Sequence, residues 1–248
     1  MIEITEHSVV VPHLPSALQG LRVAHLTDFH RSRHTSDLVL REAVAAANAA
    51  HPDLILLTGD YVTRDPRDIA PCAHILAPLQ APLGVYAILG NHDYTTDGPA
   101  MERSLIELGF HVLLNRSVLL PNGLRIVGLD DDRRDRTDVP KAFREVGPNE
   151  PTLVMAHNPA LIERMADREC LVFSGHTHGG QIRVPVLTER EIRRIGAKHY
   201  ARGWYTVGKA RLYVNRGLGR VGIPLRLFCR PELALFTLTI SPAPASPE

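Results

Sequence analysis

Cysteine is scarce in this chain, and the positions of its three cysteines exclude two kinds of structure. Cys72, Cys170 and Cys229 are odd in number, widely separated and in no Cys-x-x-Cys pattern. A disulfide framework needs paired cysteines, and a structural zinc site usually needs thiolates at short spacing. The sequence therefore predicts a chain that works in a reducing compartment.

Net charge and long apolar runs are also lacking. Lys and Arg number 28 against 27 Asp and Glu, a formal charge of +1, so no global attraction to nucleic acid or to an anionic membrane is expected. No run has the length of a transmembrane helix, and Met1–Ile4 does not open a signal peptide. We expect a cytoplasmic protein without a nucleic-acid or obligate protein partner, and peripheral contact with the inner membrane stays open.

Length and pattern predict one α/β domain over residues 1–240. Short apolar runs alternate with helical segments, so parallel strand pairing with right-handed crossovers is expected, and Asn122-Gly123 predicts a hairpin. The segment 179–204 is irregular, and the tail 241–248 is expected to be disordered. Strands are predicted at 2–11, 21–27, 53–58, 85–89, 111–114, 118–120, 124–129, 152–156, 171–174, 212–215 and 233–240, and helices at 36–50, 66–78, 99–108, 140–146 and 159–167.

Residues of the types that bind metals follow five of the predicted strands. A single cluster of this kind is typical of a turn. Five of them favour a site, because ligands of open α/β sheets gather at the carboxyl ends of strands. The five segments are Asp28–His30, Gly59-Asp60, Gly90–Asp93, His157 and Gly175–His178.

These segments offer both nitrogen and oxygen donors. Asp28 and His30 stand two apart at a strand end, which would send both side chains to one side and Phe29 into packing. Asp60 has two oxygens and can bridge two ions. The set fits manganese, iron or zinc better than calcium, and two ions about 3.5–4 Å apart would suit displacement at phosphorus. The candidate ligands are Asp28, His30, Asp60, Asn91, His157, His176 and His178.

In their order along the chain, these motifs resemble those of the calcineurin-like metallophosphoesterase superfamily. Relatives often carry Leu where Phe29 stands, a change that leaves the ligands intact. Further segments are similar to a bacterial branch that includes the YkuE-type and YaeI-type phosphodiesterases. Those segments are residues 52–54, 179–181, 214–219 and 229–232.

The resemblance implies an α/β fold, a four-layer α-β-β-α sandwich of two mixed sheets flanked by helices. It implies two divalent metal ions, with manganese favoured and iron, zinc or magnesium as alternatives. His92 would stay free to donate a proton to the leaving oxygen, and Asp93 would orient its imidazole. One ion would be held by Asp28, His30, Asp60 and His178, and the other by Asp60, Asn91, His157 and His176.

The expected activity is metal-dependent hydrolysis of phosphate esters. We expect a phosphodiesterase or pyrophosphatase that acts on a small or lipid-linked substrate, hydrolysis of a UDP-diacylglucosamine-type molecule being one version. The alternatives are a nuclease of the same superfamily and a non-catalytic metal-binding scaffold. The balanced charge gives a nuclease no support, and intact His92 and Asp93 argue against a scaffold.

Other residues near the motifs leave alternatives open. Gly179, Gln181 and Arg183 are predicted substrate contacts, with a tight turn as the alternative for the glycines. The acidic loop 130–132 favours a solvated rim over a third cation site, and the segment 221–228 favours a core position over a lipid-facing one. A basic cluster after the last motif would either bind an anionic substrate or lipid or form a salt-bridged face. It consists of Arg183, Arg190, Arg193, Arg194, Lys198 and Arg202.

Overall fold

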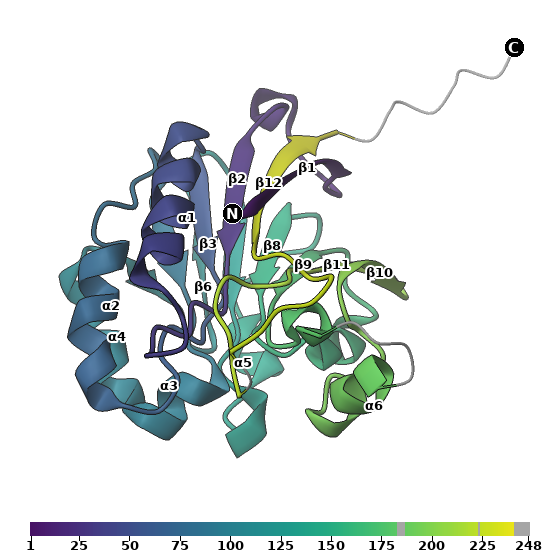
Figure 1. Ribbon diagram of the computed structural model, residues 1–248. Coiled ribbons are helices and arrows are strands. Elements are labelled where there is room, and N and C mark those ends of the chain that lie inside the picture. The colour runs from purple at the N-terminus through teal and green to yellow at the C-terminus, as the bar shows by residue number, and fades with distance from the viewer. Residues whose placement is uncertain (183–186, 223, 241–248) are drawn as a thin grey trace, which may run out of the picture.

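The computed structural model describes residues 1–182, 187–222 and 224–240 (Figure 1). Two six-stranded sheets form its centre, and helices lie on their outer faces. Arg183 and the tail 241–248 lie outside the described residues, so the predictions for them are not addressed, and the single-domain assignment stays a prediction. Within the described ranges, no helix has the length and apolar character needed to cross a membrane.

The first sheet combines both ends of the chain. Neighbouring strands in this sheet are parallel, except that β12 and β2 are antiparallel to each other. The C-terminal strand therefore lies inside the sheet, next to the N-terminal one (Figure 1). In order across the sheet, the strands are β1 (Glu3–Val10), β12 (Glu232–Thr239), β2 (Arg22–Leu26), β3 (Leu54–Leu57), β4 (Val85–Ala87) and β5 (His111–Val112).

The second sheet is also mixed. Its four inner strands are parallel and each outer strand is antiparallel to its neighbour. The predicted hairpin is confirmed, because Gly123 N–H bonds the carbonyl of Leu120 at 2.9 Å between its two strands. In order across the sheet, the strands are β10 (Gly203–Val207), β11 (Ala210–Val214), β9 (Leu171–Ser174), β8 (Thr152–Met155), β7 (Arg125–Gly128) and β6 (Arg116–Leu119).

Three apolar cores separate the layers. Along β3, Leu54 and Leu56 pack between the two sheets, while Ile55 and Leu57 pack against the helices outside the first sheet. Both faces of the strand are thus covered, which explains why its sequence is an unbroken apolar run. The predicted four-layer sandwich of two mixed sheets is confirmed.

The helices that cover the sheets follow the predicted order. On the first sheet they are α1 (Asp37–Ala49), α2 (Ile69–Leu76) and α4 (Gly98–Glu107), and on the second α5 (Val139–Ala142) and the 3-10 helix Pro159–Met165. The last two were expected as longer α-helices. In the 3-10 helix the Asn158 side chain caps Ala160 N–H, and Leu161 and Ile162 are buried against the sheet. Packing on the sheet thus outweighs helical preference there. Further 3-10 turns are Ser16–Leu18, Pro66–Asp68, Asp132–Arg134 and His178–Gly180.

Two helices were not predicted. The segment expected to be irregular contains α6 (Leu187–Arg194), in which Ile192 is buried and most of the other described side chains are polar or charged. One apolar anchor is too weak a pattern to predict a helix. The other is α3 (Asn91–Thr96), which begins inside the Gly90–Asp93 motif with the Asp93 carboxylate accepting from Gly90 N–H.

The core between the sheets gives a stability prediction. Phe173 is fully buried there and contacts His25 and Phe236 edge to face. Phe173→Ala should lower the free energy of unfolding by about 3–5 kcal/mol, because it removes a buried ring and leaves a cavity. Urea denaturation measures the loss. The control Leu119→Ala, at a half-exposed position, should cost about 0.5 kcal/mol or less, and equal losses would contradict this account of the core.

Candidate metal centre

The five strand-end segments meet at one edge of the two sheets. Every predicted ligand is buried, with at most 6% of its surface exposed. The first sheet supplies Asp28 and His30 after β2, Asp60 after β3 and Asn91 after β4, and the second supplies His157 after β8 and His176 and His178 after β9.

Asp60 lies at the centre of this cluster. Its Oδ2 atom is 3.3 Å from Nε2 of His30 and 3.2 Å from Nε2 of His157. His30 follows a strand of the first sheet and His157 a strand of the second, so one carboxylate faces imidazoles from both. Its Oδ1 atom accepts a hydrogen bond from the His92 backbone N–H at 2.8 Å.

The ligand atoms form three overlapping groups, in each of which they lie within 4.8 Å of one another. Asp60 and His30 each belong to two groups, which is the arrangement expected when neighbouring ions share ligands. The groups contain six of the seven predicted ligands together with His92, and Asn91 is not among them. The assignment of each ligand to an ion stays a prediction. They are Asp28 with His30 and His178, His30 with Asp60 and His92, and Asp60 with His157 and His176.

Two unpartnered atoms test whether these residues fit metal ions. Nε2 of His30 and Oδ1 of Asn91 are buried and have no hydrogen-bond partner in the protein. Buried polar atoms almost always have a partner, so an orphaned donor or acceptor needs an explanation. A divalent ion would supply it, and mixed imidazole and oxygen donors suit manganese, iron or zinc. The residues present therefore fit two divalent ions.

Outer hydrogen bonds fix the orientation of the imidazoles. Nδ1 of His157 lies 2.7 Å from the Thr58 carbonyl, and Nε2 of His176 lies 3.0 Å from the Ile195 carbonyl. A carbonyl only accepts, so each of these nitrogens carries the proton. The other two nitrogens, Nδ1 of His176 and Nε2 of His157, face each other at 3.2 Å beside Asp60. They lie on the side where a metal-ligating histidine presents its lone pair once that nitrogen has lost its proton.

The predicted role of Asp93 is wrong. Its carboxylate accepts hydrogen bonds from the backbone N–H groups of Gly90, Asp60 and Tyr61 at 2.8–2.9 Å. Through these bonds Asp93 holds the loop after β3 against the start of α3. The His92 ring is oriented instead by the Thr63 carbonyl, 3.0 Å from Nδ1. Asp93 therefore positions Asp60 through the backbone.

Backbone conformation, and not strand alternation, brings the ligands together. Asp28 has φ of 52° and His30 of 43°, both in the left-handed region and both beyond the end of β2. Asp60, His176 and His178 share this conformation. Such residues cost conformational energy and cluster at functional sites. Phe29 points into the core as predicted.

Close backbone approach supports this geometry at two glycines. A Cβ at Gly90 would overlap the Asp60 carboxylate, and one at Gly175 would overlap the Asp28 carboxylate and the Thr27 hydroxyl. Only glycine lets these strands pass so close to the two acids. The glycine in each motif is thus explained by the acid that it faces.

The charges in the cluster shift its pKa values. Burial opposes protonation of His30 and His157, yet interaction with Asp60 and Asp28 outweighs burial and raises the pKa of His30 to about 9 and that of His157 to about 10. Burial and the neighbouring His157 lower the pKa of His176 to about 4. Burial would raise the pKa of Asp60, but His157 holds it well below its usual range.

Sequence reasoning missed two side chains at this site. Thr63 presents its hydroxyl to Nδ1 of His30 at 3.3 Å, besides its carbonyl to His92. Arg226 lies 3.2 Å from Nδ1 of His178 and bonds the carbonyls of Arg216 and Gly219. Neither belongs to a motif; the only signal for Arg226 was an arginine within an apolar segment.

The predicted substrate contacts have structural roles. Gly179 and Gly180 have φ of 59° and 85° in a tight turn, where a Cβ would overlap Cys229 and Thr188. The side-chain amide of Gln181 both donates to and accepts from the backbone of Val221. Contact of these residues with substrate stays a prediction.

The acidic loop after β7 is not the solvated rim that was expected. Asp130 is 8% and Asp131 1% exposed. The Asp130 carboxylate accepts from the Tyr94 hydroxyl at 2.5 Å and from Asp131 N–H. Asp132 alone of the three is partly exposed, and it pairs with Arg164. The first two acids are thus drawn inward by packing against α3.

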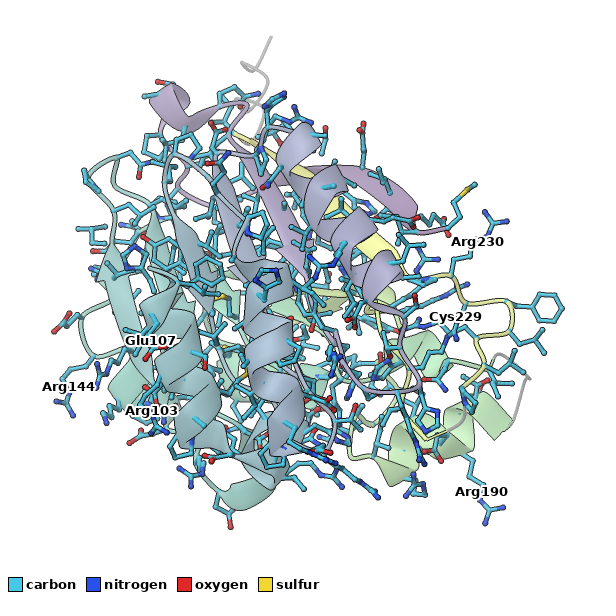
Figure 2. All side chains as sticks on the ribbon, turned by 60° about the vertical axis from the view of Figure 1, so that its left-hand side comes forward. Arg103, Glu107, Arg144, Arg190, Cys229 and Arg230 are labelled. Atoms are coloured by element: carbon cyan, nitrogen blue, oxygen red, sulfur yellow. The ribbon has the colours of Figure 1, made fainter. Side chains whose placement is uncertain are left out.

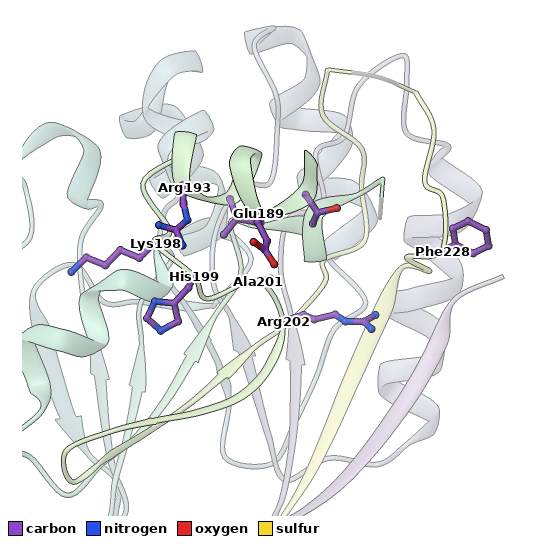
Figure 3. Close-up of a pocket in the computed structure, with 9 residues that line it drawn as sticks. Glu189, Arg193, Lys198, His199, Ala201, Arg202 and Phe228 are labelled. Carbon is purple, nitrogen blue, oxygen red and sulfur yellow. The ribbon is translucent and has the colours of Figure 1, made fainter. Parts of the chain in front are cut away.

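A pocket of about 630 Å³ lies beside the centre (Figure 3). Its walls contact the histidine segment, because Thr177 donates to the Ala201 carbonyl and His176 to that of Ile195. The lining is both basic and apolar. It consists of Thr188, Glu189, Ile192, Arg193, Lys198, His199, Ala201, Arg202 and Phe228.

The surface around this pocket differs from two expectations, one for the segment 221–228 and one for the basic cluster. Phe228 is 79% exposed, and Leu225 and Leu227 are also exposed, so the core interpretation of this segment is wrong. The basic cluster is partly salt-bridged, through Arg194 with Glu191 and Lys198 with Glu163. In the described part of the chain, no ion pair within 4.0 Å involves Arg190, which extends from α6 (Figure 2), or Arg193 and Arg202.

Comparison with known proteins agrees with this architecture and site. Residues 21–180 match the family "Calcineurin-like phosphoesterase", which covers more than half of the chain and every candidate ligand. The chain belongs to this family, and it is a metallophosphoesterase, a hydrolase that acts on phosphoric ester bonds.

Several curated relatives are bacterial proteins. The chain is 32% identical to "Uncharacterized metallophosphoesterase YkuE" of Bacillus subtilis, over 96% of this chain and 86% of that one. It is 35% identical to "Phosphodiesterase YaeI" of Escherichia coli, over 88% and 82%. It is 28% identical to "UDP-2,3-diacylglucosamine pyrophosphatase LpxG" of Chlamydia trachomatis, over 98% and 91%. The resemblance to the YkuE-type and YaeI-type branch is confirmed.

The raised pKa values of His30 and His157 give a prediction about metal binding. Both rings are protonated at pH 7, so divalent ions must displace about two protons to use them as ligands. Manganese binding should therefore release protons and weaken as the pH falls from 8 to 6. Isothermal titration calorimetry in buffers of different ionisation enthalpy counts the protons, and a pH-independent affinity would contradict the prediction.

Proposed function

We propose that the chain is a phosphodiesterase or pyrophosphatase that uses two divalent ions, with manganese favoured. The observation that carries the proposal is the placement of His92. Its ring belongs to the same group as His30 and Asp60, its Nδ1 bonds the Thr63 carbonyl, and unlike the ligands it is not fully buried. Nε2 is thus available to an ester bound at the cluster, where a leaving oxygen needs a proton.

The chain divides the chemistry among its residues. Bound divalent ions would acidify water and offset negative charge at phosphorus. Asp28, Asp60 and the imidazoles would hold those ions, and Asp93 and Thr63 would keep Asp60 and His92 in place. Because Nδ1–H bonds the Thr63 carbonyl, only the imidazolium form of His92 carries a second proton, at Nε2. It would transfer that proton to the departing oxygen and become a neutral ring, a transfer that burial favours because burial lowers the pKa of His92.

The substrate that we propose is a small or lipid-linked phosphodiester or pyrophosphate. Two of the relatives are named for such reactions, one as a phosphodiesterase and one as a UDP-2,3-diacylglucosamine pyrophosphatase. The pocket next to the histidine segment combines cations with apolar surface, which suits a molecule with an anionic and a hydrophobic part. The alternatives of a nuclease and of a scaffold have no such support.

A substrate panel tests the proposal. With manganese, the purified protein should hydrolyse bis(p-nitrophenyl) phosphate and a nucleoside-diphosphate ester faster than p-nitrophenyl phosphate, and chelator should abolish the activity. The preference is expected because the pocket beside the centre, with its cationic and apolar lining, gives the second substituent on phosphorus a place to bind. Correctly folded protein that is inactive with manganese, iron, zinc and magnesium alike would refute the proposal.

The variant His92→Ala separates an enzyme from a scaffold. On a diester with an alkoxide leaving group it should lower kcat by about 10²–10⁴-fold, the usual contribution of a positioned proton donor, while the number of bound manganese ions is unchanged. The control His74→Ala removes an exposed imidazole on α2 and should leave kcat unchanged. A fall in kcat of similar size in both variants would remove the special role of His92.

The exposed surface beside the pocket supports peripheral membrane contact at the inner face of the cytoplasmic membrane. Leu225, Leu227 and Phe228 expose apolar side chains. Phe228 lines the same pocket as Arg193 and Arg202. Apolar side chains next to unpaired cations are typical of surfaces that bind anionic lipids. Three buried free cysteines fit the reducing cytoplasm.

Liposome flotation tests this contact. The protein should float with vesicles that contain phosphatidylglycerol, and less of it should float in high salt. The double variant Phe228→Asp with Arg193→Glu should abolish flotation, because it removes an exposed apolar ring and a cation together. The control Ile106→Asp changes an exposed apolar side chain on α4. Wild-type protein that stays with the soluble fraction at low salt would exclude the contact.

A further inference from the structure

The carboxylate of Asp131 has no side-chain partner in the protein. Both of its oxygen atoms are buried without a hydrogen bond of normal geometry, and it is the only carboxylate of the described chain with this property. The Arg133 backbone N–H acts on it and lowers its pKa, but burial outweighs that effect. Other buried acids nearby are satisfied: Asp93 by backbone N–H groups, and Asp28 by the Thr27 hydroxyl and His176 N–H. A buried charge with so little compensation is costly, which points to a partner that is not a protein atom.

Strand register places Asp131 beside the candidate metal centre. β7 and β8 are parallel, Gly128 pairs with Met155, and Leu129 N–H bonds the Met155 carbonyl at 2.9 Å. Two residues further on each strand are Asp130 and His157, so the acidic loop leaves the sheet next to this histidine. On its other side the loop is tied to α3, where Tyr94 donates to Asp130.

The charges of the centre act on Asp131. Burial raises the pKa of Asp131, the neighbouring His157 lowers it and Asp60 raises it. Asp131 nevertheless belongs to none of the ligand groups found among the described residues. Its place is therefore outside the ring of direct ligands, on the side of Asn91 and His157.

The charge balance of the centre gives such a group a purpose. Two divalent ions bring four positive charges, and the seven candidate ligands include only two carboxylates, Asp28 and Asp60. The other five ligands are neutral when they bind a metal. On the side of Asn91, His157 and His176 the deficit is largest, because the only acid there is the shared Asp60. In a buried site a nearby negative charge is weakly screened and therefore effective.

We propose that Asp131 is a positioning residue of the metal centre, an outer carboxylate that strengthens binding of the divalent ion on the side of Asn91, His157 and His176. The inference rests on the proposed two-metal function. It assigns to the acidic loop an electrostatic role at the ions without direct coordination. It also explains why a charged side chain is buried there without a side-chain donor.

The test compares Asp131→Asn with wild-type protein in manganese titrations by calorimetry. Asp131→Asn should weaken one of the two ions by about 10–100-fold, the usual effect of outer groups, and leave the other unchanged. The control Asp132→Asn alters the partly exposed neighbour that pairs with Arg164 and should bind both ions as wild type does. Asp131→Ala serves as a second variant and should show the same selective loss.

Thermal unfolding without and with manganese excludes a merely structural role. Without metal, Asp131→Asn should be at least as stable as wild type, since it removes an unpartnered buried acid. With manganese, its melting temperature should rise less. Equal manganese affinities, or the same drop in melting temperature with and without metal, would overturn the inference alone. A wild-type protein that binds no ions would overturn the proposed function as well.

Discussion

The carboxylate of Asp60 is the interaction on which the rest of the site depends. It lies between His30 of one sheet and His157 of the other, 3.3 and 3.2 Å from their Nε2 atoms. This contact requires that two separate sheets end at the same edge, which the core between them enforces through residues such as Leu56 and Phe173. Packing far from the chemistry thus sets the distance at which ions would be shared.

The same contact requires an unfavourable backbone conformation at the ligand residues, which the surrounding structure must stabilise. Asp28, His30 and Asp60 have left-handed backbone conformations, which glycine adopts readily but residues with a Cβ do not. The carboxylate of Asp93 fixes the backbone at Asp60 and Tyr61, while close backbone approach at Gly90 and Gly175 shapes the space around both acids. Conformational cost is thus concentrated at the ligands and offset by hydrogen bonds just outside them.

The sequence predicted the ligands well because strand ends and residue types carry their own pattern. The order of sheet and helix layers, the hairpin at Asn122-Gly123 and the convergence of the seven side chains could all be inferred. The orientation of His92 could not, since its partner is a main-chain carbonyl that any residue at position 63 would offer. α6 has one buried apolar anchor, and the burial of Asp131 depends on contacts across the sheet, so neither leaves a local signal.

The position of β12 has a consequence for how the protein is made. This strand lies between β1 and β2, and among the described residues it is the only strand that β1 pairs with. During synthesis on the ribosome, β1 would therefore wait without this partner until residues 232–239 have emerged. Glu232 at the start of β12 also binds Arg216, next to the glycine that packs on Asp28. The catalytic edge is thus completed late in folding, and a nascent chain would be unable to hydrolyse esters before β12 has joined the sheet.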